Sequence, residues 1–170
     1  VEDVRQRSPE AGFDVIPANA DLTAAEVELV STTTKENRLR YALARVKHEY
    51  DYMLIDCPPS LNMLTVNALV AADSVLIPVQ CEYYALEGLS SLLNTVTRVQ
   101  RMLNPQLRIE GLLRTMYDAR NSLTNDVSMQ LIGHFGSRVY ATLIPRNVRL
   151  AEAPSHGKPA LVYDAASRGA

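Results

Sequence analysis

Residues 50–61 read YDYMLIDCPPSL and form the most informative segment of the chain. Residues 52–55 are apolar without interruption, which is typical of a strand that is covered on both faces of a parallel sheet. The prolines at 58 and 59 end that strand, and residues 61–72 are predicted to form a helix that begins after Ser60. The segment therefore predicts a strand–turn–helix unit.

Strand and helix signals alternate along the rest of the chain. Short apolar runs predict strands at residues 13–17, 74–79, 107–117 and 139–144. Capping signatures and apolar stripes at helical spacing predict helices over residues 24–29, 39–50, 85–104, 123–137 and 147–153. This alternation indicates an α/β fold, in which a mostly parallel sheet is flanked by helices within one domain.

The composition excludes several classes of protein. With 170 residues, 47% hydrophobic and 21% charged, the chain is neither disordered nor fibrous. No apolar run approaches the roughly 18 residues of a membrane span, and no signal-peptide pattern occurs, so no membrane partner is expected. Cys57 and Cys81 form neither a metal-ligand cluster nor a disulfide framework, which favours a cytoplasmic location.

The net charge of −2 is unevenly distributed. Residues 1–113 carry 10 Lys and Arg against 15 Asp and Glu, whereas residues 114–170 carry 7 against 4. A basic final third is compatible with a surface that binds anions or nucleic acid, although the charge pattern alone favours an ordinary solvated basic surface.

Polar residues follow the predicted strands, and open parallel sheets bind their ligands at those strand ends. Asp56 follows the apolar run and could hold Mg²⁺ through ordered water beside phosphates, or could cap the turn before the prolines. Ser60 could orient a water molecule or cap the next helix. Arg120 and Arg149 follow two later strands, where they could contact DNA phosphates or remain solvated loop arginines.

The glycines of the chain build no phosphate-binding loop. Neither G-x-x-x-x-G-K-[ST] nor G-x-G-x-x-G occurs among the 7 glycines. Residues 1–170 therefore contain no loop that could surround a triphosphate with successive backbone N–H groups.

Residues 50–61 closely resemble the Walker B and switch II segment of the ParA/Soj family of chromosome and plasmid partition ATPases. Further segments resemble the same family, namely residues 16–29, 79–88 (VQCEYYALEG), 115–120 (TMYDAR) and 144–159 (IPRNVRLAEAPSHGKP). The likeness covers nearly all of residues 13–170. The last segment is the most specific, because so long a run of unusual residues rarely matches by accident.

The resemblance implies a P-loop NTPase-like protein that binds ATP and Mg²⁺, closes into an ATP-dependent homodimer and binds DNA non-specifically. It also implies a ParB-like centromere-binding protein that stimulates hydrolysis, and a cytoplasmic, nucleoid-associated location. Carried over by motif, the site residues are Asp56 as the catalytic and metal-binding Walker B carboxylate, Pro58, Pro59 and Ser60 in switch II, Met116, Pro145 and Asn147 near the adenine, and Arg120 and Arg149 on the DNA-binding face.

The family's phosphate-binding loop precedes the segment that these residues resemble. Residues 1–170 are therefore expected to be the C-terminal two thirds of one ParA-type ATPase domain, incomplete at the N-terminus. By that expectation the intact family member hydrolyses ATP and this chain alone is inactive. Two alternatives stay open: a truncated, non-enzymatic module that binds DNA or dimerises, and a related ATPase that positions another cargo.

Overall fold

The computed structural model describes residues 1–58, 60 and 62–170. Its contacts divide the chain into two compact units. Unit 1 comprises Val1–Arg7, Asp14–Val75 and Leu92–Arg108, and unit 2 comprises Ser8–Phe13, Leu76–Ser91 and Ile109–Ala170. Among the described residues, no helix combines the length and the apolar character needed to cross a membrane.

Unit 1 is mainly helical. Its short elements are η1 (Glu2–Val4), η2 (Lys35–Asn37), η3 (Lys47–Glu49) and an antiparallel ribbon of β1 (Gln6–Arg7) with β2 (Asp14–Val15). Its longer helices are α1 (Asp21–Val30), α2 (Arg38–Ala44) and α3 (Met63–Ala71). The strand expected at 13–17 is thus reduced to β2, and it pairs antiparallel.

The single helix expected over residues 39–50 is wrong, because α2 ends at Ala44 and η3 follows as a separate turn. Val46, between them, has a φ of −116°, well outside the helical value, and its side chain is buried. The apolar stripe of the sequence describes this burial correctly. It does not reveal that α2 ends at Ala44.

Asn67 of α3 connects the helices of unit 1. Its Nδ2 donates to the carbonyl oxygens of Lys35 (2.8 Å) and Met63 (3.0 Å), and its Oδ1 accepts from the backbone N–H of Leu39 (3.1 Å). The side chain is buried, so these bonds replace the water that its amide loses on folding. One amide therefore ties α3 to η2 and α2.

The strand expected at residues 52–55 does not form. These residues carry no strand assignment, and Tyr52 and Leu54 are 88% and 94% exposed. An apolar run becomes a buried strand only where neighbouring strands and helices cover it, and within the described residues no strand pairs with this one. The sequence pattern specifies a tendency to be buried without specifying the partner.

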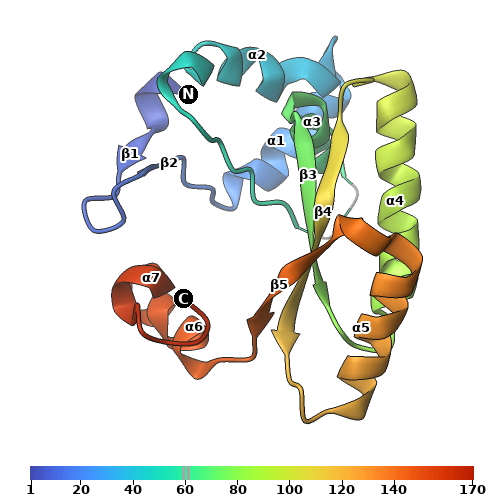
Figure 1. Ribbon diagram of the computed structural model, residues 1–170. Helices are drawn as coiled ribbons and strands as arrows, with labels where there is room; N and C mark the ends of the chain where they lie inside the picture. Colours follow the sequence, from blue (N-terminus) through green and yellow to red (C-terminus); the bar gives the residue numbers. More distant parts are fainter. Residues whose placement is uncertain (59, 61) are drawn as a thin grey trace. The chain divides into compact units, whose positions relative to one another are not determined.

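Unit 2 carries most of a three-stranded parallel sheet in the order β3-β4-β5 (Figure 1). The strands are β3 (Ser74–Gln80), β4 (Arg108–Tyr117) and β5 (Val139–Pro145). Helix α4 (Ala85–Met102), whose residues 92–102 belong to unit 1, connects β3 to β4, and α5 (Ser122–Phe135) connects β4 to β5. The remaining elements are η4 (Gly136–Arg138), α6 (Val148–Glu152), η5 (Ala153–His156) and α7 (Ala160–Tyr163). The predicted α/β fold, with its parallel sheet and flanking helices, is confirmed.

The pairing of β4 with β5 is irregular in two places. Leu112 pairs with Val139, Arg114 with Leu143, and Tyr117 with Pro145, so extra residues lie first on β5 and then on β4. The buried guanidinium of Arg114 occupies the first irregularity, where Nη2 donates to the carbonyl oxygens of Tyr140 (3.0 Å) and Ala141 (3.1 Å). Nη1 donates to Ser128 Oγ of α5 at 2.9 Å. Arg114 thereby satisfies carbonyl groups in the bulged part of the ladder.

The second irregularity lies at the end of β4. Met116 there has a φ of 52°, a left-handed conformation that is unusual for a residue other than glycine. Such positions persist where the surrounding structure holds them, and they are frequent near functional sites.

Candidate functional site

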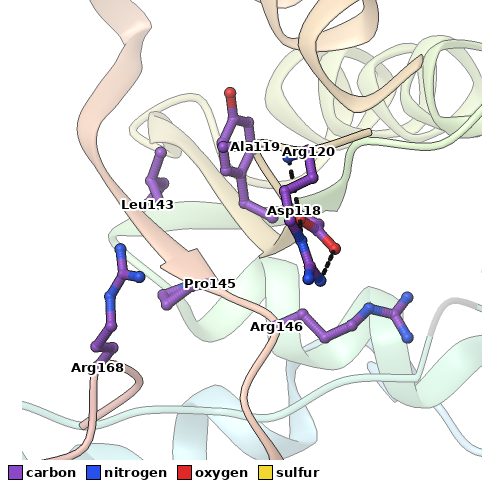
Figure 2. A pocket seen from close by; sticks show the side chains of 8 residues that line it. Asp118, Ala119, Arg120, Leu143, Pro145, Arg146 and Arg168 are labelled. Carbon is purple, nitrogen blue, oxygen red and sulfur yellow. Dashed lines mark hydrogen bonds and ion pairs between the residues drawn. The ribbon is translucent and has the colours of Figure 1, made fainter. Parts of the chain in front are cut away.

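A pocket of about 380 Å³ lies in unit 2, at the carboxyl ends of β4 and β5 (Figure 2). Its lining consists of Tyr117, Asp118, Ala119, Arg120, Leu143, Pro145, Arg146 and Arg168. This is the edge at which open parallel sheets bind their ligands. The apolar side of the pocket comes from Leu143 and Pro145, and its polar side comes from three arginines and one aspartate.

Hydrogen bonds between the two strand ends fix this side of the pocket. The backbone N–H of Arg146 donates to the carbonyl oxygen of Tyr117 at 3.0 Å, and the hydroxyl of Tyr117 donates to Asn125 Oδ1 at 2.6 Å. The Nδ2 group of Asn125 donates to the carbonyl oxygen of Ala119 at 3.0 Å. The first turn of α5 therefore holds both Tyr117 and the loop that carries Asp118 and Arg120.

Asp118 and Arg120 form a bidentate ion pair. Asp118 Oδ1 accepts from Arg120 Nε (2.9 Å) and from its backbone N–H (3.1 Å), and Oδ2 accepts from Nη2 at 2.8 Å. The side-chain bonds from Arg120, followed by its backbone bond, lower the pKa of Asp118 to about 2, and the charge of Arg146 contributes further. The carboxylate is thus ionised at neutral pH, and the charge of the exposed Arg120 side chain is already paired.

Arg149 of α6 is paired with two carboxylates. Its Nη1 lies 2.8 Å from Glu152 Oε2, and its Nε lies 3.3 Å from Asp164 Oδ2. The hydrogen bond to Glu152 is the main reason that the pKa of Arg149 is raised. Both arginines expected on a DNA-binding face therefore stand beside acidic groups, which lowers the net positive charge that they present.

The three residues expected near an adenine have different environments. Pro145 lines the pocket, and Met116 precedes the lining residue Tyr117 with its side chain partly exposed. Asn147 acts as the N-cap of α6, where its Oδ1 accepts from the backbone N–H of Arg149 at 2.8 Å. Their expected role at a base stays a prediction.

Asp56, Pro58 and Ser60 belong to unit 1, and Pro59 lies outside the described residues. Asp56 is exposed. The capping role considered for Ser60 is wrong: the N-cap of α3 is Asn62, whose Oδ1 accepts from the backbone N–H of Thr65 at 3.0 Å. Helix α3 begins only at Met63, and the carbonyl oxygen of Ser60 accepts from Thr65 Oγ1 at 2.7 Å.

No group of three or more His, Cys, Asp or Glu residues in the described part of the chain could hold a metal ion. A Mg²⁺ site does not need three such ligands, because Mg²⁺ keeps several waters and often takes only one or two carboxylates together with substrate phosphates. A single exposed carboxylate such as Asp56 fits that requirement by its chemistry.

The site residues predicted from the sequence did not include Arg146 and Arg168. Arg146 directly follows the proline that ends β5, and this position at a strand end is a signal that could have found it. Arg168 lies far from the other lining residues in the sequence, so only the folded chain places it at the pocket.

Comparison with known proteins identifies the family. A family described as AAA domain matches residues 1–109. A protein of Pseudomonas putida without an assigned function is 66% identical over 96% of this chain and 62% of its own length. The sporulation initiation inhibitor protein Soj of Bacillus subtilis is 59% identical over 100% of this chain and 67% of its own length. The chain thus spans between 56% and 67% of the length of these curated relatives and of the further ones named below.

The fold agrees with solved structures. A crystal structure of cobyrinic acid a,c-diamide synthase from Mycobacterium smegmatis, with bound ADP and magnesium, is 35% identical with a TM-score of 0.79, and the match covers 92% of this chain and 69% of that one.

Proteins named chromosome partitioning protein ParA and chromosome-partitioning ATPase Soj match nearly the whole chain at 52% to 56% identity. The chain therefore belongs to the ParA/Soj family of chromosome-partitioning ATPases.

Proposed function

We propose that this chain is part of a partition ATPase that binds ATP and Mg²⁺, dimerises, and binds DNA non-specifically to segregate a chromosome or plasmid. The observation that carries the proposal is the pocket at the carboxyl ends of β4 and β5, which contains the strand-end residues Pro145 and Arg146 of the most specific family segment. The family membership of the chain supports it independently.

Asp56 is the residue that would hold Mg²⁺ in this proposal. Its exposed carboxylate can accept hydrogen bonds from water molecules around the ion. When bound beside a nucleotide, Mg²⁺ neutralises part of the charge on the phosphates. Pro58 and Ser60 follow Asp56 in the chain and would position the backbone next to it.

Pro145 and Met116 would contact the base of the nucleotide. Pro145 offers an apolar ring at the pocket, and Met116 stands at the bulge that ends β4. The Oδ1 atom of Asn147 is used by the cap of α6, so this residue would meet a base with its Nδ2 donor. The same ordering by the cap would keep the amide of Asn147 in one orientation.

DNA binding belongs to the same proposal. Arg120 and Arg149 would contact backbone phosphates from the basic final third of the chain, after exchanging part of their present pairing with carboxylates. The protein would thereby associate with the nucleoid in the cytoplasm. Its active form would be an ATP-dependent homodimer. A ParB-like centromere-binding protein would stimulate hydrolysis by this dimer.

The test is Mg²⁺-dependent ATP turnover by the protein expressed from the complete reading frame. Asp56→Ala is expected to abolish turnover, because it removes the carboxylate assigned to Mg²⁺. Asp51→Ala is the matched control, since Asp51 is an exposed aspartate of the same segment and should leave turnover unchanged. Turnover that survives Asp56→Ala would overturn the assignment.

A second candidate follows from the sequence itself. The final third of residues 1–170 is basic, which favours a DNA-binding module. This reading predicts salt-sensitive DNA retention by the 170-residue chain without ATP. Retention should weaken in the double variant Arg120→Ala, Arg149→Ala. Binding that is unaffected by these changes contradicts it.

A further inference from the structure

Arg114 of β4 is a buried cation without a counter-ion. The residue is 8% exposed, and in the part of the chain that the structure describes no ion pair joins it to a carboxylate. Its hydrogen-bond partners are neutral, namely Ser128 Oγ of α5 and the carbonyl oxygens of Tyr140 and Ala141 on β5. Its Nε–H group has no partner among the described residues.

Stability alone does not explain an arginine at this position. Burial of an uncompensated charge and of an unpaired donor is unfavourable. Apolar residues that replace buried ionic groups often leave a protein equally stable or more stable. The two bonds from Nη2 of Arg114 to carbonyl oxygens of β5 point to a different role, which is to fix the place of β5.

The register of β5 on β4 shifts by one residue between the two ends of the pair. Near its start, Leu112 pairs with Val139. An unbroken ladder from there would place Tyr117 opposite Ile144, whereas the structure pairs Tyr117 with Pro145. A slip of one residue turns every side chain of a strand to the other face of the sheet. The irregular pairing therefore puts Pro145 on the same face as Tyr117.

The guanidinium of Arg114 holds the displaced residues of β5. The carbonyl oxygens of Tyr140 and Ala141 lie in the part of β5 that has more residues than the facing part of β4. Nη2 supplies these oxygens with hydrogen bonds that a regular ladder would take from backbone N–H groups of β4. Without the guanidinium, regular pairing becomes the way to satisfy the same oxygens.

We propose that Arg114 is a positioning residue that fixes the one-residue offset of β5 on β4 and thereby places Pro145, and not Ile144, at the pocket of the strand ends. The lining of the pocket agrees with this. Leu143 and Pro145 belong to it (Figure 2), and Ile144 between them is not among the described residues that line it. The inference rests on the proposed function in one respect, because the base contact assigned to Pro145 requires this offset.

Amide hydrogen exchange tests the offset itself, in the protein expressed from the complete reading frame. The N–H of Arg146 donates to the carbonyl oxygen of Tyr117, so it should exchange slowly in the wild type. In an unbroken ladder the nitrogen of Pro145 would take its place, and proline has no N–H. Exchange at Arg146 should therefore be roughly tenfold faster or more in Arg114→Met, while the amides of α5 exchange as before.

ATP turnover by the same protein gives the functional test. A misplaced base contact weakens the binding of substrate and transition state alike, so the KM for ATP should rise roughly tenfold in Arg114→Met with little change in kcat. A merely structural defect lowers the amount of active protein, which lowers kcat and leaves KM unchanged. Asn104→Ala is the matched control, since it removes a buried side chain of unit 1 with three hydrogen bonds and should leave KM unchanged.

Ser128→Ala carries the test if Arg114→Met does not fold. It releases Nη1 of Arg114 and should raise KM roughly threefold, since one hydrogen bond is lost; an unchanged KM then overturns the proposal. When Arg114→Met folds, an Arg146 amide as protected as in the wild type overturns it, and so does a lowered kcat with unchanged KM. A wild type without ATP turnover contradicts the proposed function instead, and amide exchange still decides the role of Arg114.

Discussion

Gly111→Ala is the substitution that the sheet of unit 2 should tolerate least. A Cβ atom at Gly111 of β4 would lie 2.6 Å from Tyr140 Cε2 and 2.9 Å from the carbonyl oxygen of Arg138. The ring of Tyr140 can rotate away, but the carbonyl oxygen belongs to the backbone that leads into β5. Relief of the contact therefore requires β4 and β5 to move apart.

The size of the effect follows from two opposing contributions. Overpacking of this kind costs about 2–3 kcal/mol, and the reduced entropy of the unfolded chain returns about 0.5–1 kcal/mol. We expect the free energy of unfolding to fall by about 1–2.5 kcal/mol. With a urea dependence of about 2 kcal/mol per molar, the unfolding midpoint should drop by about 0.5–1.2 M.

Gly133→Ala is the matched control for this prediction. Gly133 lies on α5, and a Cβ atom there meets nothing within 4 Å. Alanine is the better helix former, so this variant should gain about 0.5–1 kcal/mol and unfold at higher urea. Urea unfolding followed by circular dichroism measures both variants. A Gly111→Ala protein as stable as the wild type would refute the close approach of β4 and β5.

Three further predictions concern single side chains. The carboxyl of Asp118 should titrate by ¹³C NMR with a midpoint near pH 2, and Arg120→Gln should raise this midpoint toward 3.8. Because the pKa of Asp118 is lower in the folded than in the unfolded protein, the ion pair stabilises the fold above pH ~4. This stabilisation is lost as the pH falls toward 2. Asn104→Ala should lower the free energy of unfolding by about 1–3 kcal/mol in a urea titration, because the buried Nδ2 donates to the carbonyl oxygens of Leu69 and Ala72. Asn62→Ala should cost about 1 kcal/mol in the same measurement, since it removes the N-cap of α3.

The sequence predicted the sheet of unit 2 well. The strands expected at 74–79, 107–117 and 139–144 agree with β3, β4 and β5 to within one residue at each end, and the helices expected at 85–104 and 123–137 agree with α4 and α5 to within two. These elements have strong local signals, because prolines or polar residues end the strands and apolar stripes run along the helices.

The errors have a common physical cause. Residues 52–55 have the composition of a buried strand, but a strand also needs a partner, and Tyr52 and Leu54 are exposed. The N-cap of α3 is Asn62 and not Ser60, although serine and asparagine both favour this position. Tertiary contacts decide such cases, and no local pattern contains them.

The candidate site was predictable only in part. Arg120 was found because it follows a predicted strand, and Pro145 was found because its segment resembles the ParA/Soj family; both line the pocket. The pairing of Arg120 with Asp118 and of Arg149 with Glu152 depends on side-chain geometry at loop ends. Arg168 lines the pocket from the end of the chain, which only the folded chain shows.

The coding sequence immediately upstream of Val1 tests the central claim most directly, since the claim is that these residues are part of a partition ATPase. The account predicts that the reading frame continues upstream and encodes a glycine-rich loop of the form Lys-Gly-Gly-x-Gly-Lys-Thr, which would supply the phosphate-binding backbone absent from residues 1–170. A stop codon directly before this segment, or an upstream frame without such a loop, would contradict it.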